Sequence, residues 1–419
     1  MKKDLLKRII FDFRNIIKNA EINKRDYVFD KNANLVVTGM RRAGKSTFLY
    51  SIARELIEDG NDENRIVFIN FEDERLIDFT VSDFSDIVSV AMELTDEKVY
   101  YFFDEIQIIP GWEKFVRRLA DAKERVYVTG SNAKMLSKDI ETTLGGRFMS
   151  LNIMPYSFSE YLSALGVPHT ENDLLLTKGE ALITRHCNEF LLTGGLPENI
   201  NYTLKRDYLS SVFQKILLGD IISKNEIRHE FALKIIIKKI AEAVCTDISF
   251  SRLHSIVSGT GAAISKDKII EYVHFSIDAY LIFPVKNYYA KLVEKESNLK
   301  YYFTDTGICN LFVTDRAGAA LENSVAVALK RKYGDEVYYL KSAKTNIDID
   351  FWVPQTGEAV QVCYELNDMN LEREIKALEK LNSLCDVKVK PIIVTHCQED
   401  EIIKGEMKIQ VIPAHKFLL

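Results

Sequence analysis

Residues 34–49 read NLVVTGMRRAGKSTFL, and this stretch decides the fold of the first part of the chain. Residues 35–37 form a short apolar run that is typical of a buried strand. Residues 39–46 then spell G-x-x-x-x-G-K-S, and apolar side chains at helical spacing continue from 48 to 57. A strand, a glycine-rich turn and a helix in this order predict a phosphate-binding P-loop, the Walker A motif.

The residue types of this loop match the chemistry of a nucleotide. Gly39 and Gly44 let the backbone curl so that successive N–H groups point at a phosphate, and the following helix presents its positive end to the same anion. Lys45 is expected to reach the β- and γ-phosphates, and the Ser46 hydroxyl to hold Mg²⁺. Thr47 either packs or contacts the α-phosphate. The predicted nucleotide-binding residues are Gly39, Met40, Arg41, Arg42, Ala43, Gly44, Lys45, Ser46 and Thr47.

A second apolar strand, residues 98–105 (KVYYFFDE), ends in two acids and fits the Walker B pattern. It predicts that Asp104 holds Mg²⁺ through water and that Glu105 orients and polarises the attacking water. The presence of Glu105 favours hydrolysis over nucleotide binding alone. Glu105 also argues against a GTPase, so the expected ligands are ATP and Mg²⁺.

Two further positions extend the predicted site. Residues 125–132 (RVYVTGSN) predict another buried strand, and Ser131 or Asn132 at its end would sense the bound γ-phosphate. Asn132 fits equally as the cap of a helix that begins near Lys134. Arg147, in the segment LGGR, either supplies a positive charge to the γ-phosphate of a neighbouring subunit or is an ordinary surface or cis arginine. The first alternative predicts a homo-oligomer with Arg147 acting in trans.

Composition restricts the class of protein. The chain has 419 residues, of which 47% are hydrophobic and 28% charged, so two or three globular domains are expected. Residues 201–300 carry 15 Lys and Arg against 11 Asp and Glu, a net of +4, whereas the rest carries 40 against 50, a net of −10. Six scattered cysteines without a C-x-x-C pair favour free thiols in a reducing compartment. No apolar run reaches membrane-spanning length, and a cytoplasmic protein is expected.

Taken together, these motifs resemble those of a known family. The segments NLVVTGMRRAGKSTFLY, YYFFDEIQ, GWEKFVRRL, VTGSN, LGGRF and MPYSFSEYL resemble the prokaryotic AAA+ ATPases, in particular an archaeal and bacterial group with a C-terminal domain of unknown function. FLLTGGLPE (190–198) and LLGDIISKNEIRH are also similar to that group. The resemblance covers nearly the whole chain and implies an ATPase that uses Mg²⁺.

The middle of the chain predicts a winged-helix-like region. Three helices are expected over 231–245, 249–257 and 265–282, followed by a β-hairpin over 283–303. In a DNA-binding version, the third helix would enter the major groove with Lys266 and Lys268 at its start. Double-stranded DNA is therefore one expected partner of residues 231–303, and the alternative is a protein-binding or lid module with solvated lysines.

The last part of the chain resembles a restriction-endonuclease-like core, whose metal site needs E…D…(D/E)-x-K. Glu322 and Asp350 fit the first two positions, but Gln361 and Cys363 occupy the last pair. Glutamine is a weaker Mg²⁺ ligand than a carboxylate, and cysteine does not replace the positive charge of lysine. A degenerate domain with a structural or binding role is expected.

The predicted fold class is α/β: a P-loop NTPase of AAA+ type with a parallel sheet, a winged-helix-like helical region and a nuclease-like α/β domain. The expected boundaries are 1–160, 161–315 and 316–419. The predicted function is Mg²⁺-dependent ATP hydrolysis that drives a conformational change of the C-terminal domains, acting on DNA or a protein partner. The alternatives are a nucleotide-gated DNA-binding or defence module with little turnover, and an ATP-dependent nuclease.

Overall fold

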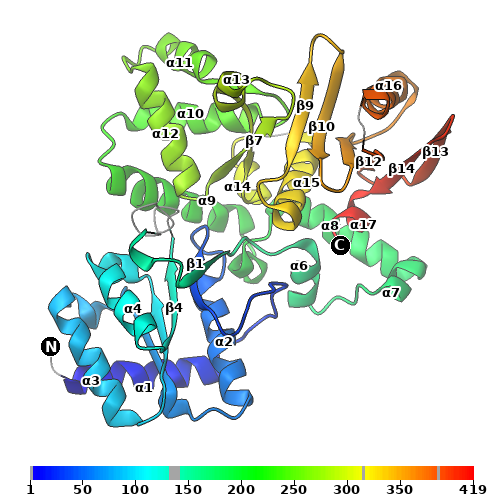
Figure 1. The fold of residues 1–419 in the computed structure, drawn as a ribbon. Helices are drawn as coiled ribbons and strands as arrows, with labels where there is room; N and C mark the ends of the chain where they lie inside the picture. Colours follow the sequence, from blue (N-terminus) through cyan, green and yellow to red (C-terminus); the bar gives the residue numbers. More distant parts are fainter. Residues whose placement is uncertain (1–2, 132–141, 314–316, 385–386) are drawn as a thin grey trace. The chain divides into compact units, whose positions relative to one another are not determined.

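The computed structural model describes residues 3–131, 142–313, 317–384 and 387–419 (Figure 1). The chain forms two compact units. The first unit comprises residues 1–154 with 278–280, and the second comprises 155–277 with 281–419.

The first unit is built on a parallel five-stranded sheet with the order β2-β3-β4-β1-β5. Its strands are β1 (Asn34–Thr38), β2 (Ile66–Asn70), β3 (Tyr100–Asp104), β4 (Arg125–Gly130) and β5 (Phe148–Asn152). Its helices of ten or more residues are α1 (Lys3–Asn19), α2 (Lys45–Glu58), α3 (Phe84–Leu94) and α4 (Trp112–Asp121). Every residue of β1 is buried, as expected for a parallel strand that is covered on both faces.

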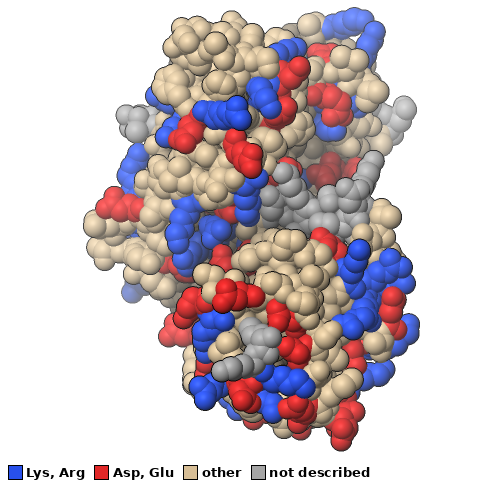
Figure 2. Space-filling view, turned by 90° about the vertical axis from the view of Figure 1, so that its left-hand side faces the viewer, with Lys and Arg blue, Asp and Glu red and all other residues tan. Residues whose placement is uncertain are grey.

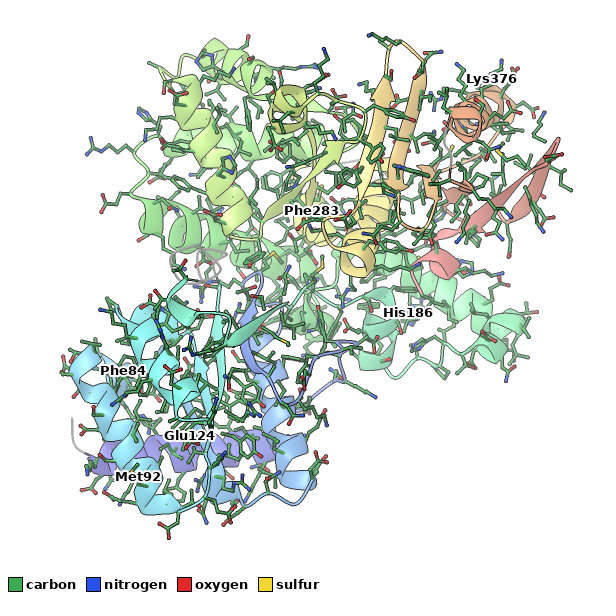
Figure 3. All side chains as sticks on the ribbon, viewed as in Figure 1. Phe84, Met92, Glu124, His186, Phe283 and Lys376 are labelled. Atoms are coloured by element: carbon green, nitrogen blue, oxygen red, sulfur yellow. The ribbon has the colours of Figure 1, made fainter. Side chains whose placement is uncertain are left out.

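Helices cover this sheet through apolar and aromatic contacts. Both α2 and α4 contact β4, and they flank the sheet on opposite sides in Figure 1. Phe84 of α3 stacks on Phe115 of α4 with ring centroids 4.3 Å apart, and Phe84 is labelled in Figure 3. The sheet is therefore held rigidly on both faces, which fixes the loops at the carboxyl ends of its strands.

The second unit contains a mixed nine-stranded sheet with the order β13-β14-β12-β11-β10-β9-β7-β8-β6. The strands are β6 (Ile248–Ser249), β7 (Ile282–Asn287), β8 (Asn298–Phe303), β9 (Tyr338–Ser342), β10 (Ile347–Val353), β11 (Glu358–Val362), β12 (Lys390–Thr395), β13 (Asp400–Lys404) and β14 (Met407–Pro413). The helices are α6 (Phe158–Ala164), α7 (Glu171–Leu175), α8 (Thr177–Thr193), α9 (Lys205–Lys215), α10 (Glu230–Glu242), α11 (Phe250–Gly259), α12 (Lys266–Asp278), α13 (Leu292–Ser297), α14 (Thr306–Cys309), α15 (Ala317–Tyr333), α16 (Asp368–Leu384) and α17 (Ala414–Phe417). A π-helical turn, Ile216–Ile222, follows α9.

Three helices and a hairpin occur in the predicted order, as α10, α11, α12 and then β7 and β8. The hairpin does not stand alone, because β7 pairs in parallel with β9. Strands from both sides of residue 316 thus share one sheet, and the domain limits drawn from the sequence remain predictions. In the C-terminal part, Leu378 and Leu381 of α16 belong to the same buried core as Ile349 of β10 and Ile393 of β12.

Two general properties follow from the described residues. None of the described helices is both long and apolar enough to cross a membrane. On the face shown in Figure 2, Lys and Arg side chains lie among Asp and Glu side chains, with broad uncharged areas in the upper part of the view. Of the six cysteines, the five in the described ranges are free thiols, and Cys385 lies outside those ranges.

Candidate nucleotide site and a second polar site

The predicted P-loop connects the carboxyl end of β1 to the start of α2. Gly39 has a φ of +141°, and a Cβ added there would lie 2.1 Å from the carbonyl oxygen of Ile153. Only glycine fits this position. Gly44, with a φ of +96°, directly precedes α2, whose first N–H groups have no partner within the helix. The loop therefore brings backbone donors and a helix N-terminus together, as an anion site requires.

Arg25 braces the same loop from a segment that the sequence analysis did not single out. Its guanidinium donates to the carbonyl oxygen of Ala43 at 3.0 Å and to that of Met154 at 2.5 Å. The P-loop is thereby tied to the chain that follows β5. No periodic pattern surrounds Arg25, so the local sequence offered no signal for this role.

Lys45 is almost completely buried beneath the loop. Its ammonium donates to the carbonyl oxygens of Gly39 at 3.1 Å and Met40 at 3.2 Å. The same nitrogen lies 3.9 Å from Oε1 of Glu105. The structure thus brings the predicted phosphate-binding lysine and the predicted Walker B glutamate to one place at the carboxyl edge of the sheet.

Asp104 ends β3 and is fully buried. Burial raises its pKa to about 6, as does the neighbouring charge of Glu105, while hydrogen bonds from Thr129 and Ser46 oppose the rise. Thr129 Oγ1 donates to Asp104 Oδ1 at 2.5 Å and accepts the N–H of Glu105 at 2.9 Å. Within the described part of the chain, Asp104 Oδ2 is buried and accepts no hydrogen bond.

This unsatisfied oxygen bears on the predicted Mg²⁺ site. Mg²⁺ is a hard cation that binds one or two carboxylates and hydroxyls while keeping several waters. A buried carboxylate oxygen without a donor, on a side chain that also contacts Ser46, provides such a ligand set. Asp104 and Ser46 therefore fit a magnesium ion.

Glu105 has a left-handed backbone with a φ of +52°, which is uncommon for a residue with a side chain. Its Oε2 accepts a hydrogen bond from Nε2 of Gln107 at 2.5 Å. Strained conformations of this kind concentrate at functional sites. No role was predicted for Thr129, because its contacts depend on how β3 and β4 line up. Gln107 lies only two residues from Glu105, and no motif indicated its contact.

The remaining predicted residues are placed differently. Ser131 is buried just beyond the carboxyl end of β4, and Asn132 lies outside the described residues. Arg147 precedes β5, where its carbonyl oxygen accepts from Asn34 at the start of β1 and its side chain pairs with Asp121. Arg147 lies at the amino ends of the parallel strands β1 and β5, whereas the P-loop follows the carboxyl end of β1. Because a strand rises about 3.3 Å per residue, the length of β1 separates the two. A role for Arg147 toward its own nucleotide is excluded, and a role in trans stays a prediction.

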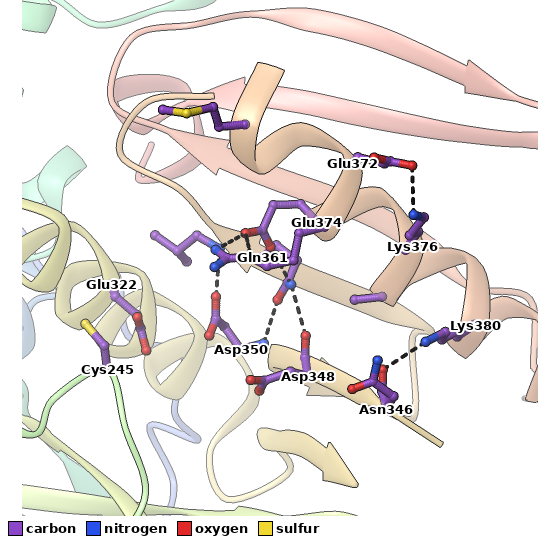
Figure 4. Close-up of a pocket in the computed structure, with 14 residues that line it drawn as sticks. Cys245, Glu322, Asn346, Asp348, Asp350, Gln361, Glu372, Glu374, Lys376 and Lys380 are labelled. Carbon is purple, nitrogen blue, oxygen red and sulfur yellow. Dashed lines mark hydrogen bonds and ion pairs between the residues drawn. The ribbon is translucent and has the colours of Figure 1, made fainter. Parts of the chain in front are cut away.

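A second polar cluster lies in the second unit, around a cavity of about 640 Å³ (Figure 4). Glu322 of α15, Asp350 of β10 and Gln361 of β11 all line it, so the structure brings these three predicted positions together. Burial raises the pKa of Glu322 above its ordinary value. Cys363 does not line this cavity, and its thiol donates to the carbonyl oxygen of Glu365.

The cluster contains a lysine that sequence analysis missed. Lys300 of β8 is 3% exposed, and its ammonium lies 3.0 Å from Asp350 Oδ1 and 3.3 Å from Glu322 Oε1. Burial by itself lowers the pKa of Lys300, but the two carboxylates more than offset this and hold that pKa above its ordinary value. Lys300 lies far from the other positions in sequence, so only the pairing of strands could reveal it.

Comparisons with known proteins agree with the first unit's geometry. A model of the AAA domain matches residues 31–162, and a model described as a domain of unknown function (DUF8612) matches residues 184–317. The latter match follows the AAA domain and contains the segments FLLTGGLPE and LLGDIISKNEIRH, so it confirms the expected domain of unknown function C-terminal to the ATPase domain. No comparison supports a nuclease-like fold for the last part.

Relatives extend over the whole chain. An uncharacterised protein of Methanocaldococcus jannaschii is 32% identical over 100% of this chain and 96% of its own length. An uncharacterised protein of Haemophilus influenzae is 29% identical over 81% of this chain and 84% of its own length. A solved Walker-type ATPase of Pyrococcus abyssi is 13% identical, with 71% of this chain and 99% of that one covered and a TM-score of 0.42. The chain therefore belongs to a family of archaeal and bacterial proteins in which an AAA-type P-loop ATPase domain is followed by a domain of unknown function.

Proposed function

We propose that this chain hydrolyses ATP at the P-loop and uses the reaction to change the conformation of its C-terminal domains. The observation that carries the proposal is the convergence of Lys45, Asp104 and Glu105 at one edge of the sheet. Lys45 and Glu105 approach to 3.9 Å, and Asp104 keeps a buried oxygen without a donor among the described residues. These are the parts that phosphoryl transfer needs: a cation for the phosphates, a magnesium ligand and a water-orienting acid.

Each residue has a defined task in the proposed reaction. Lys45 exchanges the carbonyls of Gly39 and Met40 for the β- and γ-phosphate oxygens. Asp104 and Ser46 would hold Mg²⁺, which neutralises phosphate charge when bound. Glu105 accepts a hydrogen bond from the water that attacks the γ-phosphorus as the bond to the bridging oxygen breaks, leaving ADP and phosphate.

The test is ATP turnover of the wild type, Lys45→Ala and Glu105→Gln at several protein concentrations. Glu105→Gln should lower kcat by about 10²-fold or more while nucleotide still binds, because a positioned acid or base contributes about 10²–10⁴-fold. Lys45→Ala should weaken nucleotide binding as well as turnover. Bound ATP without turnover in the wild type would instead favour a nucleotide-gated switch.

Double-stranded DNA is the proposed partner of residues 231–303. Lys266 and Lys268 begin α12 with exposed side chains, although Lys268 pairs with Glu271 at 2.6 Å. If DNA binds here, it should stimulate turnover, and the affinity should fall steeply with salt because phosphate contacts release counterions. A Lys266→Ala variant with unchanged DNA affinity would favour the alternative, a protein-binding or lid module.

The alternative of an ATP-dependent nuclease receives less support from the second polar site. The Gln361 amide is already committed: its Oε1 accepts the N–H of Asp350, and its Nε2 donates to Glu374. Mg²⁺-dependent cutting of DNA that disappears in Asp350→Ala would nevertheless establish this activity.

A further inference from the structure

The buried ammonium of Lys300 lies at the centre of the second polar site. The ammonium bridges Asp350 Oδ1 and Glu322 Oε1, which come from β10 and α15 respectively. Glu322 Oε1 also accepts the Tyr302 hydroxyl at 2.7 Å, and Asp350 Oδ2 accepts the N–H of Val362 at 3.0 Å. Both carboxylates are thus supplied with donors from within the chain.

A divalent metal ion does not fit this arrangement. Mg²⁺ binds oxygens at about 2.0–2.1 Å in octahedral geometry, so an ion shared by Asp350 and Glu322 would need the space that the Lys300 ammonium occupies. The side-chain oxygen of Gln361, the third expected ligand, already accepts a hydrogen bond from the N–H of Asp350.

We propose that Lys300 takes the place of a metal ion in this core, as a built-in cation that bridges Glu322 and Asp350. A buried pair of carboxylates needs a positive charge, because burying uncompensated charge is strongly unfavourable. Lys300 supplies it without a bound metal, and Tyr302 adds a neutral donor. The cavity beside Lys300 is therefore a polar pocket that holds no divalent cation, and it does not cleave DNA with the help of a metal ion.

The test measures Mn²⁺ binding by electron paramagnetic resonance in the nucleotide-free full-length chain. All variants carry Asp104→Asn, which removes the acid of the ATPase site. This parent should bind no Mn²⁺ that depends on Asp350. Adding Lys300→Ala should create one Mn²⁺ site at least tenfold tighter than any in the parent, and adding Asp350→Asn as well should abolish it. Lys286→Ala is the matched control and should behave as the parent, because Lys286 is a half-buried lysine on the neighbouring strand β7 that pairs with Glu296.

Two results would overturn the proposal. The first is a Mn²⁺ site in the parent that Asp350→Asn removes, because the core would then hold a metal beside Lys300. The second is a folded Lys300→Ala or Lys300→Gln variant that gains no Mn²⁺ affinity. Thermal unfolding gives a second readout, since Mn²⁺ should raise the Tm of Lys300→Ala and leave that of the parent unchanged. ATP turnover enters neither readout, so the outcome is independent of the proposed ATPase function.

Discussion

At the scale of single residues, burial of the Asp104 carboxylate lowers the stability of the fold at neutral pH. Its pKa in the folded chain is raised from 3.8 to about 6 by burial. A raised pKa means that the folded state binds a proton more readily than the unfolded state, so the associated stability is present below about pH 4 and is lost as pH rises through 6. At pH 7 the buried charge is therefore destabilising in protein free of Mg²⁺ and nucleotide.

Replacing Asp104 with asparagine should remove this cost. At pH 7.5, without Mg²⁺ or nucleotide, the free energy of unfolding of Asp104→Asn should exceed that of the wild type by up to about 3 kcal/mol, since one pKa unit corresponds to about 1.4 kcal/mol. The difference should shrink as pH falls from 6 to 4. Urea unfolding at several pH values measures it, with Asp96→Asn, an exposed acid of the same unit, as the control. A difference that grows toward low pH would contradict the assignment.

The residues that could be predicted are those whose role depends on adjacent positions. Lys45, Asp104 and Glu105 follow from short motifs in which strand, turn and helix are consecutive. Thr129 and Lys300 act across strands that are distant in sequence, Thr129 on Asp104 and Lys300 on Asp350. Their roles depend on strand order, which a single sequence does not determine.

At the scale of elements, Asp305 links the turn after α8 to the start of α14. Its Oδ2 accepts the N–H of Gly195 at 2.8 Å, and its Oδ1 accepts the N–H of Ile308 at 3.0 Å. Gly194 lies so close that an added Cβ would be 2.3 Å from Asp305 Oδ1. The segment FLLTGGLPE thus has a structural role: Gly194 leaves room for a buried carboxylate, and the N–H of Gly195 binds it.

Asp305→Asn should destabilise the second unit even though it removes a buried charge. An asparagine has only one acceptor oxygen, so its NH₂ group would face a backbone N–H donor. We expect a loss of about 2 kcal/mol or more in the free energy of unfolding, the usual cost of hydrogen bonds to a charged group and of a buried donor left unpaired.

Chemical denaturation followed by fluorescence measures this loss. Asp267→Asn, in the exposed first turn of α12, serves as the control and should change stability by less than about 0.5 kcal/mol. Equal stabilities of the two variants would show that the Asp305 carboxylate contributes nothing to the link.

The elements themselves were largely predictable. Ser249 caps α11 by accepting the N–H of Arg252, and Ser265 accepts the N–H of Lys268 near the start of α12, as is typical of serines that precede helices. The parallel pairing of β7 with β9 could not be read from the sequence. This pairing joins strands that are separated in sequence by β8 and by the helices α13, α14 and α15. It depends on tertiary packing, so a hairpin that looked like an isolated wing is part of a larger sheet.

At the scale of the whole molecule, we predict that active sites are shared between subunits through Arg147. Arg147 lies at the edge of its own sheet opposite the P-loop, so it has no access to the nucleotide of its own chain. If it acts on a neighbour's γ-phosphate, Arg147→Ala should lower turnover at least tenfold, since arginines that complete such sites contribute about 10³–10⁵-fold. Turnover per subunit of the wild type should also rise with protein concentration.

Mixing two inactive variants tests this sharing directly. Glu105→Gln retains Arg147 but has a disabled site, whereas Arg147→Ala has an intact site but lacks the arginine. In a mixed oligomer, an Arg147→Ala subunit beside a Glu105→Gln subunit regains a complete site, so the mixture should turn over ATP faster than the two variants measured separately. Arg117→Ala is the matched control, because Arg117 also approaches Asp121 and is exposed on α4; it should keep wild-type turnover. An Arg147→Ala variant that matches this control, or a mixture with no gain, would make Arg147 an ordinary partner of Asp121 and leave each chain to complete its own site.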